Sequence, residues 1–144
     1  MALPASHCTY NTHYHIVFPI KYRRALNEAG LPEAIAQITH EIGLRYDIDF
    51  EAVGFDADHI HLLCSFSPAQ YKGGDVVRIY KSITAKQLFL QFPQLRKQLW
   101  GGNLWSAGYY FATVGERGDW SIVHRYVQNQ GKAIDTVTQL NLFI

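Results

Sequence analysis

The chain has 144 residues, enough for one folded domain, and we expect a single domain over residues 1–144. Its 48% hydrophobic and 17% charged residues are typical of globular proteins and exclude a disordered chain or a coiled coil. The formal net charge is only +1, but residues 1–70 contain 4 basic and 8 acidic residues, whereas residues 71–144 contain 9 basic and 4 acidic ones. A polyanion should therefore bind the second half of the chain.

No apolar stretch approaches the roughly 20 residues that a membrane span needs, and the N-terminus lacks the features of a signal peptide. Two cysteines cannot form a disulfide scaffold, and Cys64, inside an apolar run, is expected to be a small buried hydrophobe. We expect a soluble cytoplasmic protein with no membrane partner.

The first half of the chain predicts three strands and a helix. Residues 10–20 are rich in β-formers, and residues 33–46 carry apolar side chains at helical spacing. Residues 48–55 alternate apolar and acidic side chains, and residues 59–66 form a more apolar run after the turn at 56–58. The last two runs are close enough in sequence to pair as a hairpin.

The second half predicts a long helix, a strand and a final helix. Asp75 is a plausible N-cap for the long helix, which should end near Pro93. Residues 104–114 are predicted as the fourth strand, and Asp119 can cap the last helix. Residues 133–144 have no clear period. The order β-α-β-β-α-β-α predicts an α+β, ferredoxin-like (RRM-like) antiparallel sheet with helices on one face and its first and third strands adjacent.

Two His-x-His pairs carry the strongest chemical signal. On a strand, His59 and His61 point to one face and can bind one ion, while Ile60 points to the other. The pattern alone is weak, because 7 histidines in 144 residues produce roughly a third of a His-x-His by chance. The second pair, His13 and His15, lies on the neighbouring strand, where either residue can orient the first pair. Ordinary hydrogen-bonded histidines remain the commoner explanation for each pair alone.

A metal ion on two histidines needs a further ligand, and the final predicted helix offers one. Tyr126 and Gln130 are four residues apart and share a helical face, although such residues are most often simply solvated. Zinc motifs such as Cys-x-x-Cys and His-Glu-x-x-His are absent from the sequence. A Gly-x-x-x-x-Gly-Lys-Ser/Thr loop is absent as well, so we expect no nucleotide cofactor.

Four segments together resemble the single-tyrosine HUH transposases (TnpA type) of the smallest insertion sequences. They are HYHIVFPIKYRR, FDADHIHLLCSF, LWGGNLWSAGYYFATVG and HRYVQNQG, spread over residues 10–132. The family's histidine pair matches His59 and His61, its nucleophilic tyrosine matches Tyr126, and its glutamine ligand matches Gln130.

The resemblance implies cutting and rejoining of single-stranded DNA by metal-dependent transesterification through a 5′-phosphotyrosine. It implies Mg²⁺ or Mn²⁺ as cofactor, hairpin ends of an insertion sequence as substrate, and a homodimer with shared active sites. Imidazole ligands favour Mn²⁺ over Mg²⁺, which prefers oxygen. Of the nine tyrosines, Tyr109 and Tyr110 lack a glutamine at helical spacing, and Tyr14 should point away from its flanking histidines.

The sequence also contains candidate residues for contacts with the DNA. Basic residues that follow the first strand or lie on the long helix are equally consistent with phosphate binding and with a solvated surface. They are Lys21, Arg23, Arg24, Arg78, Lys81 and Lys86. Trp105, Tyr109 and Trp120 are candidates for base stacking, although a place in the core is the commoner role for such residues.

Three other functions stay open at this point. A replication initiator or relaxase would share the chemistry but is usually larger than 144 residues. A domesticated relative that processes repeated palindromes would act as a monomer. A non-catalytic binder of single-stranded nucleic acid would use the same fold, but HIHLLCSF is a poor stacking platform.

Overall fold

The computed structural model describes residues 3–5, 8–21, 28–56, 58–98 and 103–114. Tyr126, Gln130 and the predicted last helix lie outside these residues. The elements in chain order are β1 (Leu3–Ala5), β2 (Cys8–Tyr10), β3 (His13–Pro19), α1 (Leu31–Tyr46), β4 (Asp49–Asp56), β5 (His59–Ser65), α2 (Gly73–Gln91), α3 (Pro93–Gln98) and β6 (Tyr110–Val114). No helix in the described part of the chain combines the length and apolarity that a membrane crossing requires.

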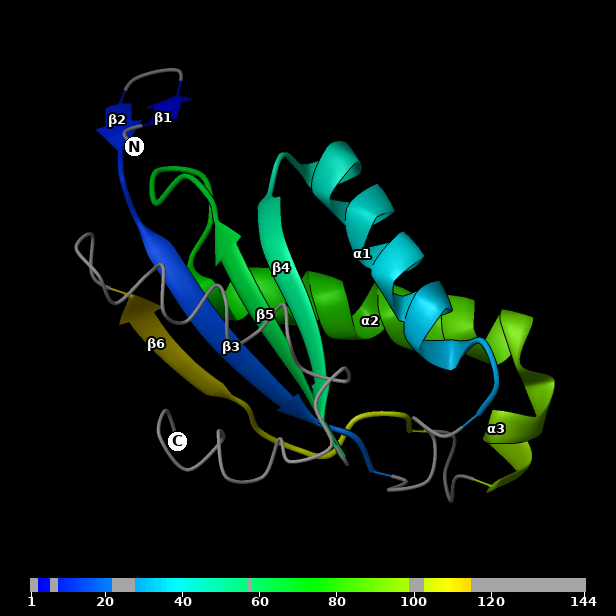
Figure 1. The fold of residues 1–144 in the computed structure, drawn as a ribbon. Coiled ribbons are helices and arrows are strands. Elements are labelled where there is room, and N and C mark those ends of the chain that lie inside the picture. The colour runs from blue at the N-terminus through cyan, green and yellow to red at the C-terminus, as the bar shows by residue number, and fades with distance from the viewer. Residues whose placement is uncertain (1–2, 6–7, 22–27, 57, 99–102, 115–144) are drawn as a thin grey trace.

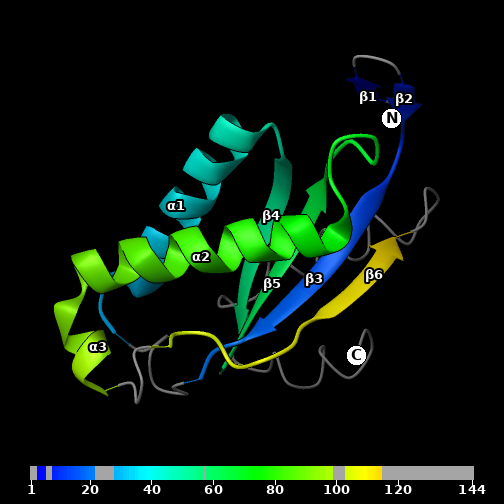
Figure 2. The same ribbon diagram turned by 180° about the vertical axis from the view of Figure 1, so that it is seen from behind.

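The main sheet has four antiparallel strands in the order β4-β5-β3-β6. Both α1 and α2 lie on one side of it (Figures 1 and 2). This is the predicted ferredoxin-like arrangement, with the first and third strands of the motif, β3 and β5, adjacent in the centre. The strands β1 and β2 form a separate two-stranded hairpin next to the start of β3, which the sequence interpretation did not foresee (Figure 1).

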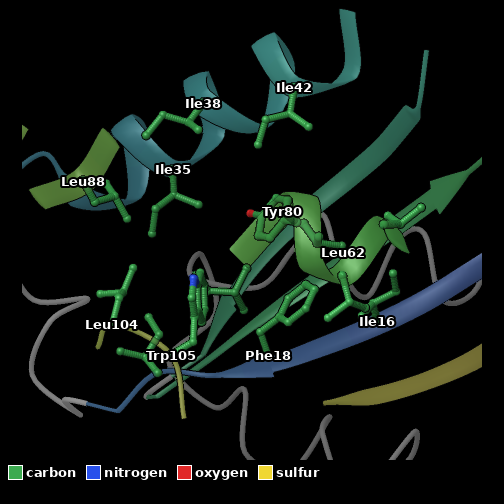
Figure 3. Close-up of a cluster of buried hydrophobic side chains, with 14 of the residues drawn as sticks. Ile16, Phe18, Ile35, Ile38, Ile42, Leu62, Tyr80, Leu88, Leu104 and Trp105 are labelled. Atoms are coloured by element: carbon green, nitrogen blue, oxygen red, sulfur yellow. The ribbon is translucent and has the colours of Figure 1, made fainter. Parts of the chain in front are cut away.

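The hydrophobic core fills the space between the sheet and the helices. Ile35, Ile38 and Ile42 project from α1 at helical spacing toward the sheet, and Phe18 stacks on Tyr80 of α2 with ring centroids 5.1 Å apart (Figure 3). Cys64 belongs to this core and is fully buried, as predicted.

The starts of the two long helices differ from the predicted ones. The helix α1 begins at Leu31 and not at residue 33, because Gly30 adopts a left-handed φ of 83° and Pro32 fits the first turn. Asp75 is not the N-cap of α2: it lies in the first turn, where its carboxylate accepts a 3.0 Å hydrogen bond from the amide of Lys72. The helix α2 ends at Gln91, close to Pro93 as predicted, and Pro93 then starts the short helix α3, which the sequence did not predict.

The predicted strand at 104–114 is only partly a strand. Trp105 forms an isolated bridge with Ile20, and β6 starts five residues later, at Tyr110. Gly108 adopts a φ of 85° between them, which interrupts extended pairing. The residues from Ser106 to Tyr109 therefore form a loop, and only the second half of the run joins the sheet.

In β4 the side chains that face the core switch from even to odd positions, and a β-bulge accounts for this switch. Phe50 pairs with Cys64 and Ala52 with Leu63, so Glu51 is the extra residue. Phe50 is an even position and Val53 an odd one, and both pack against the core. A regular strand would turn one of them outward, whereas the one-residue bulge keeps both on the helix side.

Candidate metal centre on the face opposite the helices

The strand β5 divides its side chains between two faces. Ile60, Leu62 and Cys64 enter the core under the helices, so His59 and His61 point to the opposite side, as the alternation predicted. On the adjacent strand, Phe18 enters the core and His15 faces away from it. We call this second side of the sheet the histidine face, defined by His13, His15, His59 and His61.

His15 and His61 are in direct contact at the centre of this face. Nε2 of His15 lies 3.1 Å from Nδ1 of His61, and the rings stack with centroids 5.3 Å apart. His61 is completely buried, and His15 is 3% exposed. The sequence left open whether His13 or His15 would meet the predicted ligand pair, and the register of β3 on β5 selects His15.

His59 is held by its sequence neighbour. Its Nδ1 donates to the carboxylate of Asp58 at 2.6 Å, at the point where β5 begins. The imidazole is about one-third exposed, in contrast to that of His61. Because Nδ1 of each ring is engaged, by Asp58 in one case and His15 in the other, Nε2 of each is the nitrogen that can bind a metal ion.

His13 has a different partner. Its Nδ1 donates to the carboxylate of Glu51 at 2.7 Å, across the intervening strand β5. The hydrogen bond between His13 and Glu51 lies at the end of the sheet where β3 begins, whereas His59 lies beside Pro19, where β3 ends. The two His-x-His pairs therefore do not form one cluster of four.

Burial keeps the central rings neutral. It lowers the pKa of His15 to about 4 and that of His61 to about 3, the latter with smaller contributions from the neighbouring His15 and His59. Neutral imidazole is the form that binds metals, so His61 needs no deprotonation at pH 7 before it can bind one.

These donors fit a divalent cation but do not complete its coordination. Among the described residues, no three His, Cys, Asp or Glu side chains come together as a metal site. Two imidazoles whose Nδ1 atoms are held by neighbouring side chains, those of His59 and His61, are suitable ligands for a first-row transition ion such as Mn²⁺. A further oxygen donor is needed, and the predicted one, Gln130, lies outside the described residues, as does Tyr126.

A second feature lies on the other side of the edge strand. A groove of about 690 Å³ runs between α2 and the loop that precedes β6, with Arg78, Lys81, Ser82, Asn103 and Tyr109 among its lining residues. We call it the α2 groove. Its floor is mainly apolar and includes Val77, Ala85, Leu104 and part of Trp105.

The predicted DNA contacts fall into separate groups. Lys21 is exposed and follows β3, and its amide donates to the carbonyl of Leu104 at 2.9 Å. Arg78 and Lys81 line the α2 groove, and Lys86 is exposed one turn beyond Ser82 on the same helix. Arg23 and Arg24 lie outside the described residues.

The aromatic candidates for base stacking, and the other tyrosines considered, also lie in different parts of the structure. Trp105 is a core residue whose indole donates to Thr84 at 3.0 Å, so the core interpretation is correct for it. Tyr109 is 46% exposed in the α2 groove, whereas Tyr110 turns to the histidine face and contacts the ring of His15 edge-on. Tyr14 points into the helix side and stacks on Phe66, as predicted. Trp120 lies outside the described residues.

Comparison with known proteins decides the family. A family model described as "Transposase IS200 like" matches residues 8–130. The chain belongs to the IS200-like transposase family. The matched range contains both histidines of β5 together with Tyr126 and Gln130. As a member of this family, the protein is a DNA transposase.

Individual relatives agree with this assignment. The chain is 31% identical over 121 residues to the ISDra2 transposase TnpA of Deinococcus radiodurans, covering 84% of this chain and 85% of the relative. It is 27% identical over 125 residues to the transposase for insertion sequence element IS200 of Salmonella typhimurium, covering 87% and 80%.

Solved structures support the fold of this IS200-like transposase. A crystal structure from Deinococcus radiodurans R1, described as that of a transposase, aligns with a TM-score of 0.70 at 28% identity and covers 89% of this chain and 97% of the other. A tyrosine transposase bound to a REP hairpin aligns with a TM-score of 0.53, covering 87% and 70%, and at 11% identity it supports the fold alone.

Two partners in the transposase were missed by sequence reasoning. Glu51 of β4 holds His13 although their strands are not neighbours, and only the break in alternation at Ala52 hinted at the bulge beside it. The second partner, Asp58, holds His59 through a hydrogen bond that the sequence did not predict. A carboxylate immediately before a strand histidine is a weak signal, which gains meaning only once the turn geometry is known.

Proposed function

We propose that this transposase cuts and rejoins single-stranded DNA by metal-dependent transesterification, with Tyr126 as the nucleophile. The observation that carries the proposal is the histidine centre itself: His59 and His61 share one face, and each ring is oriented through its Nδ1 by a neighbouring side chain. Such orientation is typical of histidines that bind metals, and it is unnecessary for solvated ones. Family membership supports the same chemistry.

The residues of the chain would act as follows. His59 and His61 hold a divalent cation through Nε2, and Gln130 contributes its amide oxygen. The bound cation supplies Lewis-acid stabilisation of negative charge on the scissile phosphate. Tyr126, after losing its phenolic proton, attacks the phosphorus; the bond to the 3′-oxygen breaks, and that oxygen leaves as a 3′-hydroxyl after protonation. Attack by a free 3′-hydroxyl then reverses these steps and releases Tyr126.

His15 has a defined part in this proposal. A metal ion on Nε2 of His61 requires the proton of that ring to be on Nδ1. In this tautomer His61 donates to Nε2 of His15 across the observed 3.1 Å. His15 is therefore proposed as a positioning residue, which fixes both the tautomer and the ring plane of the ligand.

The DNA partner is proposed to be the hairpin ends of an insertion sequence. A tyrosine transposase of the same fold is bound to a REP hairpin, which is consistent with a hairpin substrate here. We also propose a homodimer with shared active sites, in which Tyr126 of one subunit serves the His59–His61 pair of the other.

A mixing experiment tests the chemistry and the sharing together. Purified protein is incubated with single-stranded DNA from the flanking ends of its own gene and Mn²⁺, and denaturant-resistant protein–DNA adducts are counted. Tyr126→Phe and His61→Ala should each be inactive alone. If active sites are shared, a mixture of the two variants regains adducts, because one site of each mixed dimer is intact. Adducts from Tyr126→Phe alone would refute the assigned nucleophile, and an inactive mixture would refute sharing.

A further inference from the structure

The α2 groove has the features of a binding site for an unpaired nucleotide. It lies on the helix side of the edge strand, because Tyr110 of β6 faces His15 and the preceding Tyr109 faces α2. Its volume of about 690 Å³ is within the range of sites that bind small organic molecules. The groove and the histidine face are therefore separated by one strand at the edge of the sheet.

The aromatic ring in this groove is exposed but held in place. Tyr109 is 46% exposed, although large aromatic side chains are usually buried. The ammonium of Lys81 lies 5.9 Å from its ring centroid and donates to the carbonyls of Ser106 and Gly108, at 3.2 Å and 2.9 Å. Lys81 thus fixes the loop that carries Tyr109, and the ring is preorganised for a stacking partner.

The charges around the groove favour an anionic occupant. Arg78 and Lys81 line it, and Lys86 lies exposed one turn beyond Ser82. The acidic side chain nearest on α2 is Asp75, which pairs with Arg78 and accepts from the amide of Lys72. A guanidinium has five N–H donors, so Arg78 can bind a phosphate while it keeps this pair.

We propose that the α2 groove binds a nucleotide of single-stranded DNA, with its base on Tyr109 and its phosphate between Arg78 and Lys81. This inference rests on the proposed function, since it identifies where the single strand outside the cleavage site lies. The combination of an apolar floor, an exposed aromatic ring and two cations is what single-strand recognition requires, because every base has a face that can stack. The strand would then cross the edge at β6 to reach the histidine face.

The test measures binding of a fluorescein-labelled oligothymidylate by anisotropy over a series of salt concentrations. Tyr109→Ala should weaken binding by roughly 5- to 150-fold, the range typical of one lost stacking contact, and Tyr109→Phe should bind like the wild type. Arg78→Ala should reduce the slope of log K against log salt by about 0.7. The matched control is Arg45→Ala, which removes the same charge from the end of α1, beside Tyr46, and should change neither value beyond a small general effect.

Each alternative result is decisive. If the wild type binds and Tyr109→Ala binds equally well while keeping the wild-type melting temperature, the groove is not the site, and the proposed function is untouched. If the wild type does not bind the oligothymidylate, the groove proposal fails, whereas the proposed function is judged separately by adduct formation on the flanking DNA of the gene. If Tyr109→Ala instead changes the oligomeric state in size-exclusion chromatography with light scattering, a second copy of the chain occupies the groove, and the nucleotide proposal is wrong.

Discussion

Acid should destabilise the metal-free protein through the buried pair His15 and His61. Burial lowers their pKa values to about 4 and about 3, whereas an unfolded histidine has a pKa of about 6.5. Below pH 6.5 the unfolded chain therefore binds more protons than the folded one. The free energy of unfolding falls as the pH decreases from 6.5, and the loss levels off only below the folded pKa values.

The magnitude follows from these values. Between pH 7 and pH 5, each histidine that stays neutral in the folded state contributes a loss of about 2 kcal/mol. The pair therefore accounts for about 3 to 4 kcal/mol, which is a large part of the roughly 5 to 15 kcal/mol that stabilises a typical domain. Since His15 is 3% exposed and His61 fully buried, solvent screening reduces this figure little.

Urea unfolding with EDTA present, followed by circular dichroism at several pH values, measures the effect. The comparison is the double variant His15→Gln/His61→Gln, which lacks both titrating side chains. Its free energy of unfolding can differ from that of the wild type at every pH, but the difference between the two pH slopes is due to the two histidines. The wild type should lose about 3 to 4 kcal/mol more than the variant between pH 7 and pH 5. Equal pH slopes for the two proteins would refute the argument that burial keeps these two histidines neutral in the folded state.

Three further predictions concern local packing and the metal. A Cβ on Gly73 would lie 2.8 Å from the ring of Phe111, whereas one on Gly74 would meet nothing nearer than 4.0 Å. Gly73→Ala should therefore lower the free energy of unfolding, measured by thermal denaturation, by about 1 to 3 kcal/mol, and Gly74→Ala should not lower it. Asp75→Ala should lower the midpoint of urea unfolding, since it removes the acceptor for the amide of Lys72, and Asp75→Asn should recover part of this loss. Replacing Mg²⁺ by Mn²⁺ should maintain or raise the rate of adduct formation, because two ligands are imidazoles; activity with Mg²⁺ that disappears in Mn²⁺ would contradict the ligand set.

The arrangement of strands and helices could be predicted because it depends on local patterns. The alternation in β5 and the apolar spacing of α1 determine which side chains meet, and the ferredoxin-like order then makes β3 and β5 neighbours. Boundaries were less predictable where the backbone takes a left-handed turn. The positive φ of Gly30 starts α1 early, and that of Gly108 shortens the last strand.

The partners of the histidines could not be predicted because they depend on register between strands. His13 and His15 have the same pattern in the sequence, yet a difference of two residues along β3 assigns one to Glu51 and the other to His61. Register is set by packing of the whole sheet and by the bulge at Glu51, neither of which a local pattern determines. The roles of Tyr126 and Gln130 came from the family resemblance and stay predictions.

The most direct test of the proposed function is to locate the covalent bond. The wild-type adduct, formed on single-stranded DNA with Mn²⁺, is digested with a nuclease and then with trypsin and analysed by tandem mass spectrometry. Residues 126–132 follow Arg125 and end at Lys132, and Tyr126 is the only tyrosine among them. The expected result is a nucleotide phosphate on Tyr126 in this peptide. A nucleotide on the peptide that contains Tyr109 and Tyr110, or on a residue other than tyrosine, would contradict the mechanism.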